Sequence, residues 1–197
     1  MSFNETPRAN RLHIGFYGRR NAGKSSLINL LTGQNTALVS EFAGTTTDPV
    51  IKSMELPPLG PITIIDTAGL DDEGSLGELR ISKSKKMMEQ TDLAILVIPA
   101  HCAENIEDEK LWLNDLITMD IPVLGVINQI KESTTEKITS IKETIEKELG
   151  IPFIVLSSLD KRDRAELLSA IVQNAPTAFE SSTLVGDLFS PGALVVL

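Results

Sequence analysis

The stretch from Gly18 to Ser25 constrains this chain more than any other feature, because it has the pattern G-x-x-x-x-G-K-S. An apolar run over residues 12–17 precedes it and predicts a buried strand, and apolar positions at helical spacing follow over residues 26–32. A phosphate-binding loop needs this strand–loop–helix context. The alternative is a glycine turn that leads into an ordinary helix, but the glycines, the lysine and the serine all stand in the right context for the loop.

The chemistry of such a loop explains its residue types. Several backbone N–H groups, including the unpaired ones at the start of the following helix, must point at phosphate oxygens, and bulky side chains would block them. Lys24 supplies a positive charge for the outer phosphates, and the hydroxyl of Ser25 supplies an oxygen ligand for Mg²⁺. We therefore expect the loop to bind a nucleotide through Asn21, Ala22, Gly23, Lys24, Ser25 and Ser26.

The composition limits the other classes of function. The chain has 197 residues and a net charge of −9, which argues against a binder of nucleic acid or of membrane surfaces, since both need a basic face. A single cysteine, Cys102, excludes an intrachain disulfide and fits a reducing compartment. The first residues do not have the pattern of a signal peptide, and no apolar run approaches the roughly 20 residues of a membrane span. We predict a cytoplasmic protein without nucleic-acid or membrane partners.

Buried strands and amphipathic helices alternate along the chain. The predicted strands are residues 11–17, 50–56, 62–65, 93–98, 121–127 and 152–156. The predicted helices are residues 26–32, 79–90 and 106–117, a segment capped by Ser133 and Gly150, and a segment that ends at Asn174; residues 34–48 show no clear period. This alternation predicts an α/β fold of the P-loop NTPase class, with a doubly wound, mostly parallel six-stranded sheet and helices on both faces. We expect an N-terminal arm over residues 1–10, a nucleotide-binding domain over 11–174 and a separate segment over 175–197.

A second motif, Asp66-Thr67-Ala68-Gly69, directly follows the strand predicted at residues 62–65. An acidic residue at the end of such a strand faces the phosphate-binding loop and is the usual partner of Mg²⁺, which assigns this role to Asp66. At Gly69 a backbone N–H can approach a terminal phosphate, because no side chain stands in the way. The pattern D-x-x-G is common by chance, but its place after a strand favours the functional interpretation.

The order of these motifs resembles that of the translation-factor-like branch of the small GTPases. The matching segments are the loop at residues 18–25, Gly44-Thr45-Thr46, Asp66-Thr67-Ala68-Gly69, Asn128 after a strand, and Ser157-Ser158-Leu159. The resemblance implies GTP and GDP as ligands together with Mg²⁺. It also implies that Asn128, Gln129, Ser157, Ser158 and Leu159 bind the nucleotide.

Within that branch, the chain is more similar to the potassium-activated group that includes the tRNA-modifying GTPase MnmE. In that group the loop asparagine, here Asn21, helps to bind K⁺, and the segment with Thr45 and Thr46 closes over the ion, Thr46 reaching Mg²⁺ when GTP is bound. Leu70 stands where many GTPases keep a catalytic glutamine, and Glu78 aligns with the glutamate that orients the attacking water. Glu78 is alternatively a solvated acid at the start of a helix. The resemblance implies slow, K⁺-stimulated GTP hydrolysis with catalytic roles for Lys24, Thr46, Gly69 and Glu78.

In its sequence segments, the chain most resembles the GTPase domain of the iron-iron (FeFe) hydrogenase maturation factor HydF. The similar segments are residues 66–74 with Gly77-Glu78-Leu79-Arg80, and Leu184-Val185-Gly186-Asp187-Leu188 followed by Pro191-Gly192. The resemblance implies that residues 175–197 are a linker and the start of a truncated dimerisation domain, and that partners are hydrogenase-maturation proteins. It also implies a homodimer formed through this tail or through the two switch segments, residues 34–48 and 67–78, which the two nucleotide states of such a GTPase reposition. The family's iron–sulfur cluster needs several cysteines, so we expect no cluster here.

One departure from the GTPase pattern concerns the base. GTPases usually read guanine with Asn-Lys-x-Asp, whereas this chain has Asn128-Gln129-Ile130-Lys131, and a lysine cannot accept the hydrogen bonds that the aspartate takes from guanine. Glu132 could substitute through a local shift. Two alternatives therefore stay open: a non-hydrolysing nucleotide-binding interaction module with relaxed guanine specificity, and a P-loop enzyme that uses ATP.

Overall fold

The structure is a computed structural model that describes residues 11–33, 38–42, 50–67, 85–102, 104–129 and 134–176. Within these residues the strands are β1 (Leu12–Tyr17), β2 (Leu38–Phe42), β3 (Val50–Leu56), β4 (Gly60–Asp66), β5 (Leu93–Pro99), β6 (Val123–Asn128) and β7 (Phe153–Leu156). The helices are α1 (Lys24–Thr32), α3 (Glu107–Thr118), α4 (Thr135–Leu149) and α5 (Arg164–Asn174), with short 3₁₀ helices η4 (Ala100–Cys102) and η5 (Lys161–Asp163).

The strands form one sheet in the order β2-β3-β4-β1-β5-β6-β7. The five strands from β4 to β7 in that order pair in parallel, with Ile14 opposite Ile64 and Gly125 opposite Phe153. The strands β2, β3 and β4 pair antiparallel. The predicted doubly wound, mostly parallel α/β sheet is therefore confirmed.

The described part of the sheet has seven strands, one more than the six that the sequence predicted. The additional strand is β2, at the edge of the sheet, within the segment that showed no clear period. It has five residues, and its register with β3 shifts between Leu38 and Ser40. A short edge strand pairs on one side only and needs no long alternating pattern, so the sequence contains little sign of it.

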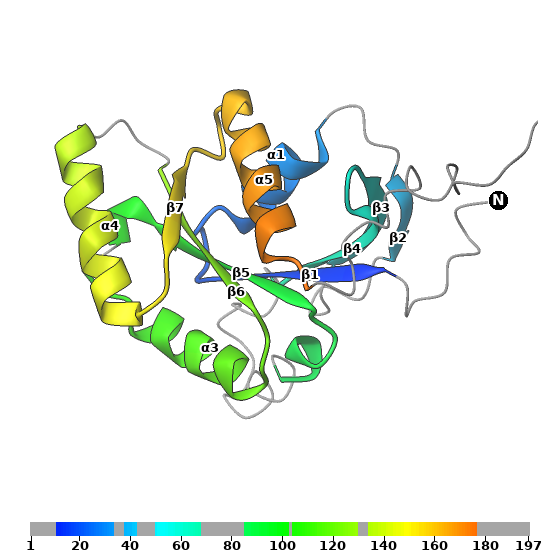
Figure 1. Ribbon diagram of the computed structural model, residues 1–197, viewed down its shortest axis with the longest axis horizontal. Coiled ribbons are helices and arrows are strands. Elements are labelled where there is room, and N and C mark those ends of the chain that lie inside the picture. The colour runs from blue at the N-terminus through cyan, green and yellow to red at the C-terminus, as the bar shows by residue number, and fades with distance from the viewer. Residues whose placement is uncertain are drawn as a thin grey trace, which may run out of the picture.

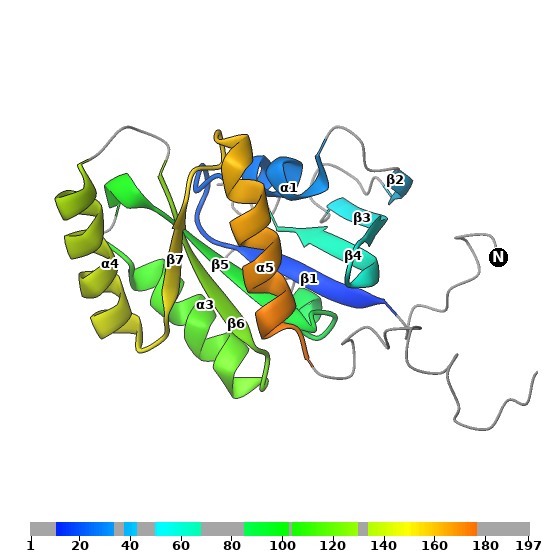
Figure 2. The same ribbon diagram turned by 45° about the horizontal axis from the view of Figure 1, so that its top comes forward.

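Helices cover both faces of the sheet (Figures 1 and 2). Successive side chains of the central strand β5 point to opposite faces, which separates the apolar core into two clusters. Ile95 packs in one cluster with Leu27 of α1 and Leu167 of α5. Leu96 packs in the other with Leu113 of α3 and Ile145 of α4. Thus α1 and α5 lie on one face, and α3 and α4 lie on the other. None of the helices in the described ranges is long and apolar enough to cross a membrane.

The ends of α4 test the predicted caps. The helix begins at Thr134, whose hydroxyl accepts a hydrogen bond from the backbone N–H of Lys137 at 3.4 Å. The prediction of Ser133 as the cap was wrong by one residue, because Thr134 has the extended backbone that lets its side chain reach the helix. Gly150 ends the helix in the left-handed conformation, at a φ of 70°, as predicted. Of the helix predicted at residues 79–90, residues 85–88 are helical, and residues 79–84 lie outside the described part.

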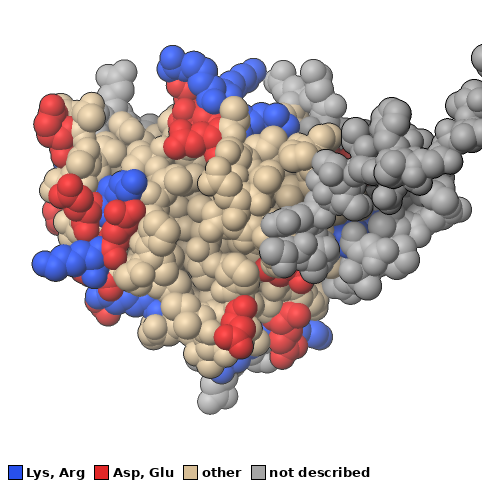
Figure 3. Space-filling model, in the orientation of Figure 1, with Lys and Arg blue, Asp and Glu red and all other residues tan. Residues whose placement is uncertain are grey.

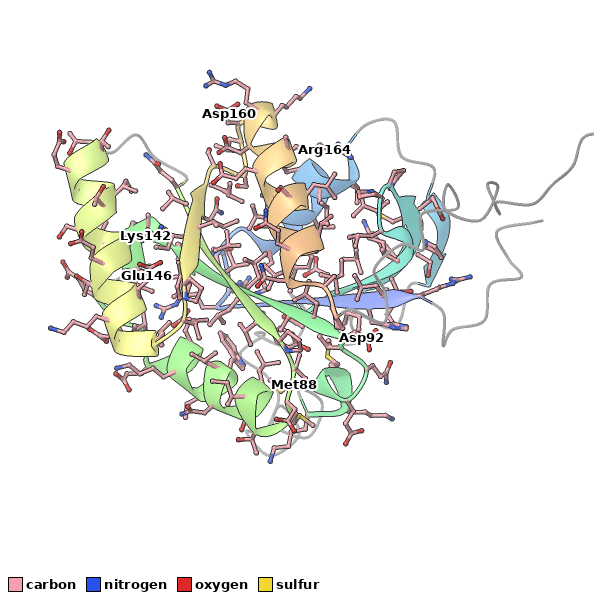
Figure 4. The ribbon with its side chains drawn as sticks, in the orientation of Figure 1. Met88, Asp92, Lys142, Glu146, Asp160 and Arg164 are labelled. Atoms are coloured by element: carbon pink, nitrogen blue, oxygen red, sulfur yellow. The ribbon has the colours of Figure 1, made fainter. Side chains whose placement is uncertain are left out.

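Polar side chains fix the outer helices in place (Figure 4). At the start of α5, the guanidinium of Arg164 donates from Nε to the carbonyl of Leu31 in α1 at 3.0 Å. On α4, the carboxylate of Glu146 accepts from the backbone N–H of Phe153 at 2.7 Å, and Lys142 lies 3.8 Å from the same carboxylate. These contacts tie α5 to α1 and α4 to β7.

The parallel strands all have their carboxyl ends on the same side of the sheet. The residues that follow or end these strands there are Gly18 after β1, Asp66 in β4, Asn128 in β6 and Ser157 after β7. In open α/β sheets ligands bind outside the carboxyl ends of the strands, so the site is expected on this side of the sheet.

Candidate functional site

The loop between β1 and α1 needs its two glycines. Gly18 has a φ of +143°, and a Cβ added there would lie 2.3 Å from the carbonyl oxygen of Val97. Gly23 has a φ of +95°, and its Cβ would lie 1.9 Å from the side-chain nitrogen of Asn128. Asn21 is exposed and has a φ of 60°, a left-handed conformation that asparagine tolerates better than most residues. The sequence pattern is therefore matched by a compact loop closed against β5 and β6.

Lys24 lies at the start of α1 with its ammonium group turned back into the loop. The residue is 4% exposed, and its Nζ donates to the carbonyl of Gly18 and, at 3.0 Å, to the carbonyl of Arg19. The carbonyl of Arg19 also accepts from the backbone N–H of Ala22 at 3.2 Å. A buried ammonium held by backbone carbonyls is a fixed positive charge at the mouth of α1, where anions also meet the positive end of the helix.

Ser25 and Asp66 come together from α1 and β4. The Oγ of Ser25 donates to Oδ2 of Asp66 at 2.8 Å. The segment after Asp66 is held in place because the hydroxyl of Thr67 donates to the carbonyl of Phe16 in β1 at 2.6 Å. A hydroxyl and a carboxylate are the hard oxygen donors that Mg²⁺ prefers, so the residues present fit this ion. The structure thus brings together the two described residues that were predicted to bind Mg²⁺.

Asn128 links three parts of the site. Its side chain is wholly buried, its Nδ2 donates to the carbonyl of Ala22 at 2.8 Å, and its Oδ1 accepts from the backbone N–H of Ser158 at 3.1 Å. The next residue, Gln129, donates its N–H to the carbonyl of Leu156 at 2.7 Å. Asn128 therefore holds the phosphate-binding loop against the segment after β7, where Leu159 is 70% exposed.

Several residues of the predicted site lie outside the described part of the chain. They are Gly44, Thr45 and Thr46 of the first switch segment, Gly69, Leu70 and Glu78 of the second, and Lys131 and Glu132 near the base-reading motif. Their roles stay predictions. The residues from the predicted set that the structure does bring together are Ala22, Gly23, Lys24, Ser25, Asp66, Asn128 and Ser158.

An ion pair that the sequence analysis did not anticipate joins the loop to α3. The guanidinium of Arg19 donates from Nε to one carboxylate oxygen of Glu109 at 2.7 Å and from Nη2 to the other at 2.6 Å. It also donates to the carbonyl of Asn105. The hydrogen bonds that Arg19 donates to Glu109 raise the pKa of the arginine above its ordinary value. A sequence signal existed: Glu109 falls on the apolar stripe of α3 with Ile106 and Leu113, where a charge needs a partner.

A buried hydroxyl pair lies directly before the loop. Tyr17, the last residue of β1, is 2% exposed, and its hydroxyl is 2.8 Å from that of Thr91, which donates to the carbonyl of Met87 at 3.0 Å. Burial raises the pKa of Tyr17 to about 12, although the hydrogen bond with Thr91 acts in the opposite direction. Gly15 makes room for this pair, since a Cβ there would lie 2.6 Å from the tyrosine ring.

This arrangement defines a class of protein. A glycine-containing loop after the first parallel strand, a lysine and a serine at the start of the following helix, and a carboxylate at the end of a neighbouring strand are the parts of a P-loop nucleotide hydrolase. The comparisons with known proteins identify the family within this class. Residues 13–129 match the family described as 50S ribosome-binding GTPase, which is more than half of the chain. The chain belongs to this GTPase family.

Curated relatives and solved structures agree with this assignment. The chain is 31% identical over 196 residues to the tRNA modification GTPase MnmE of Campylobacter jejuni strain RM1221, a match that covers 90% of this chain and 43% of that protein. It is 32% identical over 172 residues to MnmE of Geobacillus thermodenitrificans, covering 87% and 35%. The chain thus spans less than half the length of these relatives.

Among solved structures, a variant of Aquifex aeolicus Era bound to GDP and AlF₄⁻ superposes with a TM-score of 0.67 and 26% identity, over 83% of this chain and 56% of that one. The predicted P-loop NTPase fold and the prediction of GTP hydrolysis are confirmed by the family and by this likeness. The GTPase fold implies GTP or GDP as the ligand, with Mg²⁺. Resemblance to MnmE-like GTPases was also predicted correctly.

Proposed function

We propose that this domain is a Mg²⁺-dependent GTPase that is stimulated by K⁺ and acts as a molecular switch in the maturation of FeFe hydrogenase. The observation that carries the proposal is the convergence of Lys24, the Ser25–Asp66 pair and Asn128 at the carboxyl ends of the parallel strands. The two nucleotide states would reposition residues 34–48 and 67–78 and so change the surface that partner proteins meet.

In the reaction, water attacks the γ-phosphorus of GTP, the bond from this phosphorus to the bridging oxygen of the β-phosphate breaks, and GDP and inorganic phosphate leave. The ammonium of Lys24 and the backbone N–H groups of the loop bind the β- and γ-phosphates. Ser25 and Thr46 would hold Mg²⁺, with Asp66 positioning the Ser25 hydroxyl through its 2.8 Å hydrogen bond. When bound, Mg²⁺ neutralises charge that develops on the phosphate oxygens.

Three residues support stimulation by K⁺. Asn21 is exposed on the loop in a left-handed conformation, so its side-chain oxygen is available to a cation beside the phosphates. Leu70 offers no polar group to orient water, which leaves this role to Glu78. A monovalent cation would supply the charge that an arginine finger supplies in other GTPases. The backbone N–H of Gly69 would donate to the γ-phosphate.

Phosphate release from GTP with Mg²⁺ in matched KCl and NaCl buffers tests this proposal. We expect turnover several-fold faster in K⁺, and we expect Asn21→Ala to reduce the ratio of the two rates towards one. Asn114→Ala, an exposed change on α3, is the matched control and should leave the ratio as in the wild type. Tight GTP binding without turnover in either salt would contradict the enzymatic proposal, and equal rates in both salts would contradict the role of K⁺.

A second proposal concerns the base. Both ends of the Asn128 amide are engaged by the protein, and Lys131 cannot accept hydrogen bonds from guanine. We infer that discrimination against adenine is weaker than in GTPases with the full motif, where losing such a charge-assisted contact costs roughly 1.5–3 kcal/mol. ATP should therefore compete measurably for bound GDP, and Lys131→Asp should make it compete about tenfold or more less well. If ATP does not compete in the wild type, Glu132 or another residue reads the base.

The role in hydrogenase maturation is supported by the wording of residues 66–80 and 184–192. We propose a cytoplasmic protein that acts with hydrogenase-maturation proteins and dimerises through residues 175–197 or the switch segments. In Figure 3, Lys and Arg lie beside Asp and Glu near the margin of this face, and its described residues form no broad basic surface, which favours protein partners over nucleic acid. In a strain without the gene, the wild type should restore hydrogenase activity and Lys24→Ala should not. Restoration of tRNA modification instead would indicate that this protein acts as its relatives, the tRNA modification GTPases MnmE, are named.

A further inference from the structure

The ion pair between Arg19 and Glu109 has the features of a fixed connection. Both carboxylate oxygens of Glu109 accept from the guanidinium, at 2.7 and 2.6 Å, and the Glu109 side chain is completely buried, with Arg19 only 23% exposed. Two parallel hydrogen bonds between planar groups define both the distance and the orientation of the arginine. The pair of half-buried Lys110 with exposed Glu107, at 2.9 Å, does not have this constraint.

Arg19 is also the residue whose backbone contacts the lysine of the loop. Its carbonyl oxygen accepts from Nζ of Lys24 at 3.0 Å and from the N–H of Ala22 at 3.2 Å. The same residue therefore connects α3, through its side chain, to the ammonium of Lys24, through its backbone. A rotation of the Arg19 peptide would move the acceptor that holds the ammonium and would change the turn that presents the loop N–H groups.

We propose that Arg19 is a positioning residue of the phosphate site, held by the buried carboxylate of Glu109, and that it acts on the β- and γ-phosphates and not on the base. The inference rests on the proposed nucleotide-binding function. Beyond that function, Glu109 of α3, a residue outside the loop and the switch segments, sets the affinity for the outer phosphates. Asn128 donates to the carbonyl of Ala22 and accepts from the N–H of Ser158, whereas Arg19 contacts Ala22 only through that residue's N–H.

The test compares GDP with GMP, which has the same base, ribose and first phosphate but lacks the β-phosphate that the loop lysine binds. The dissociation constants of both are measured by competition against fluorescent GDP with Mg²⁺ present. The variants are Arg19→Lys, which keeps the charge without the planar fork, and the double variant Arg19→Met/Glu109→Leu. Glu107→Gln, on the same turn of α3 but exposed, is the matched control. The double variant is included because apolar replacement of a buried ion pair often preserves stability, whereas removal of one partner does not.

We expect the GDP dissociation constant to rise roughly tenfold in both Arg19 variants, as for the loss of a charge-assisted contact, while that of GMP changes less than twofold. Glu107→Gln should match the wild type for both ligands. Folding of the variants is judged by an unchanged melting temperature. If the folded variants keep the wild-type ratio of the GDP and GMP dissociation constants, the inference is overturned. A parallel loss of GDP and GMP binding would also overturn it, because it would indicate a general structural role. Failure of the wild type to bind GDP would instead overturn the proposed function.

Discussion

At the residue scale, Gly23 carries the strictest steric requirement in the site. A methyl group there would lie 1.9 Å from the amide nitrogen of Asn128, at a φ of +95°. We therefore expect Gly23→Ala to break the bridge from Asn128 to Ala22 and to abolish GDP binding, measured by calorimetry. Gly150→Ala is the control, because that glycine has a φ of +70° and no atom near its Cβ, so only strain of about 1–2 kcal/mol results. GDP binding that survives in Gly23→Ala would contradict the rigid fit described here.

Tyr17 gives a prediction about pH, because it is the only tyrosine in the chain and burial raises its pKa to about 12. A raised pKa means that folding favours the protonated hydroxyl. The stabilisation is complete below the unfolded pKa of about 10 and is lost as the pH rises through 12, a difference of roughly 3 kcal/mol.

Urea unfolding of the wild type and of Tyr17→Phe at intervals from pH 9 to 12 measures this difference. The loss of stability between these limits should be larger in the wild type, and tyrosinate absorbance of the folded protein should develop only near its upper end. A tyrosine that ionises near pH 10 in the folded protein would show that the hydroxyl is open to water.

The residues that the sequence predicted correctly as neighbours are those whose spacing reflects a local requirement. Lys24 and Ser25 follow a glycine loop at fixed positions, and Asp66 ends a strand that must lie beside β1. The pair of Arg19 with Glu109 joins residues 90 positions apart in the chain, and neither residue belongs to a short motif that implies the other. Such pairs depend on where α3 packs against the sheet, which pattern and propensity do not determine.

At the scale of single elements, the start of α4 tests which residue caps the helix. The hydroxyl of Thr134 accepts from the N–H of Lys137, so Thr134→Ala should destabilise the protein by about 1 kcal/mol in urea unfolding. Ser133→Ala should have a smaller effect, although the sequence pattern suits either residue. Thr139→Ala, which removes only a bond back to the carbonyl of Thr135, should cost less than about 0.5 kcal/mol or be slightly stabilising, on the scale of helix propensities. A larger loss for Ser133→Ala than for Thr134→Ala would reverse the assignment.

The strands also show why some parts of the fold can be predicted from the sequence and others cannot. Strand β5 is buried along its whole length, so its seven residues form an unbroken apolar run that is easily recognised. The edge strand β2 contains Ser40 and Glu41 and pairs irregularly, and its sequence does not separate it from a loop. Burial of β5 on both faces produces this apolar run, whereas the polar residues in the sequence of β2 interrupt any such run.

At the scale of the whole molecule, the site is a product of the strand order. Adjacent β4 and β1 bring Asp66 to the loop, while β6 and β7 bring Asn128 and Ser158, from the other half of the chain, to the same loop. Phosphate groups and base would therefore be bound by segments that are more than 100 residues apart, as the Asn128 to Ala22 contact already is, with a separation of 106. Nucleotide binding should thus stabilise the whole domain and not one element.

This linkage makes a prediction for Asn128→Asp. GDP at 100 times its dissociation constant should stabilise the wild type by about 2.7 kcal/mol, which corresponds to a rise in melting temperature of roughly 5–10 °C for a domain of this size. In Asn128→Asp a buried carboxylate replaces the amide that donates to the carbonyl of Ala22 at 2.8 Å, so two acceptors would face each other. We expect a lower melting temperature without nucleotide and a GDP-dependent rise reduced to about 2 °C or less at the same GDP concentration. The exposed Asn114→Asp should keep the full rise. A full rise in Asn128→Asp would mean that the two halves of the site bind the nucleotide independently of the bridge between them.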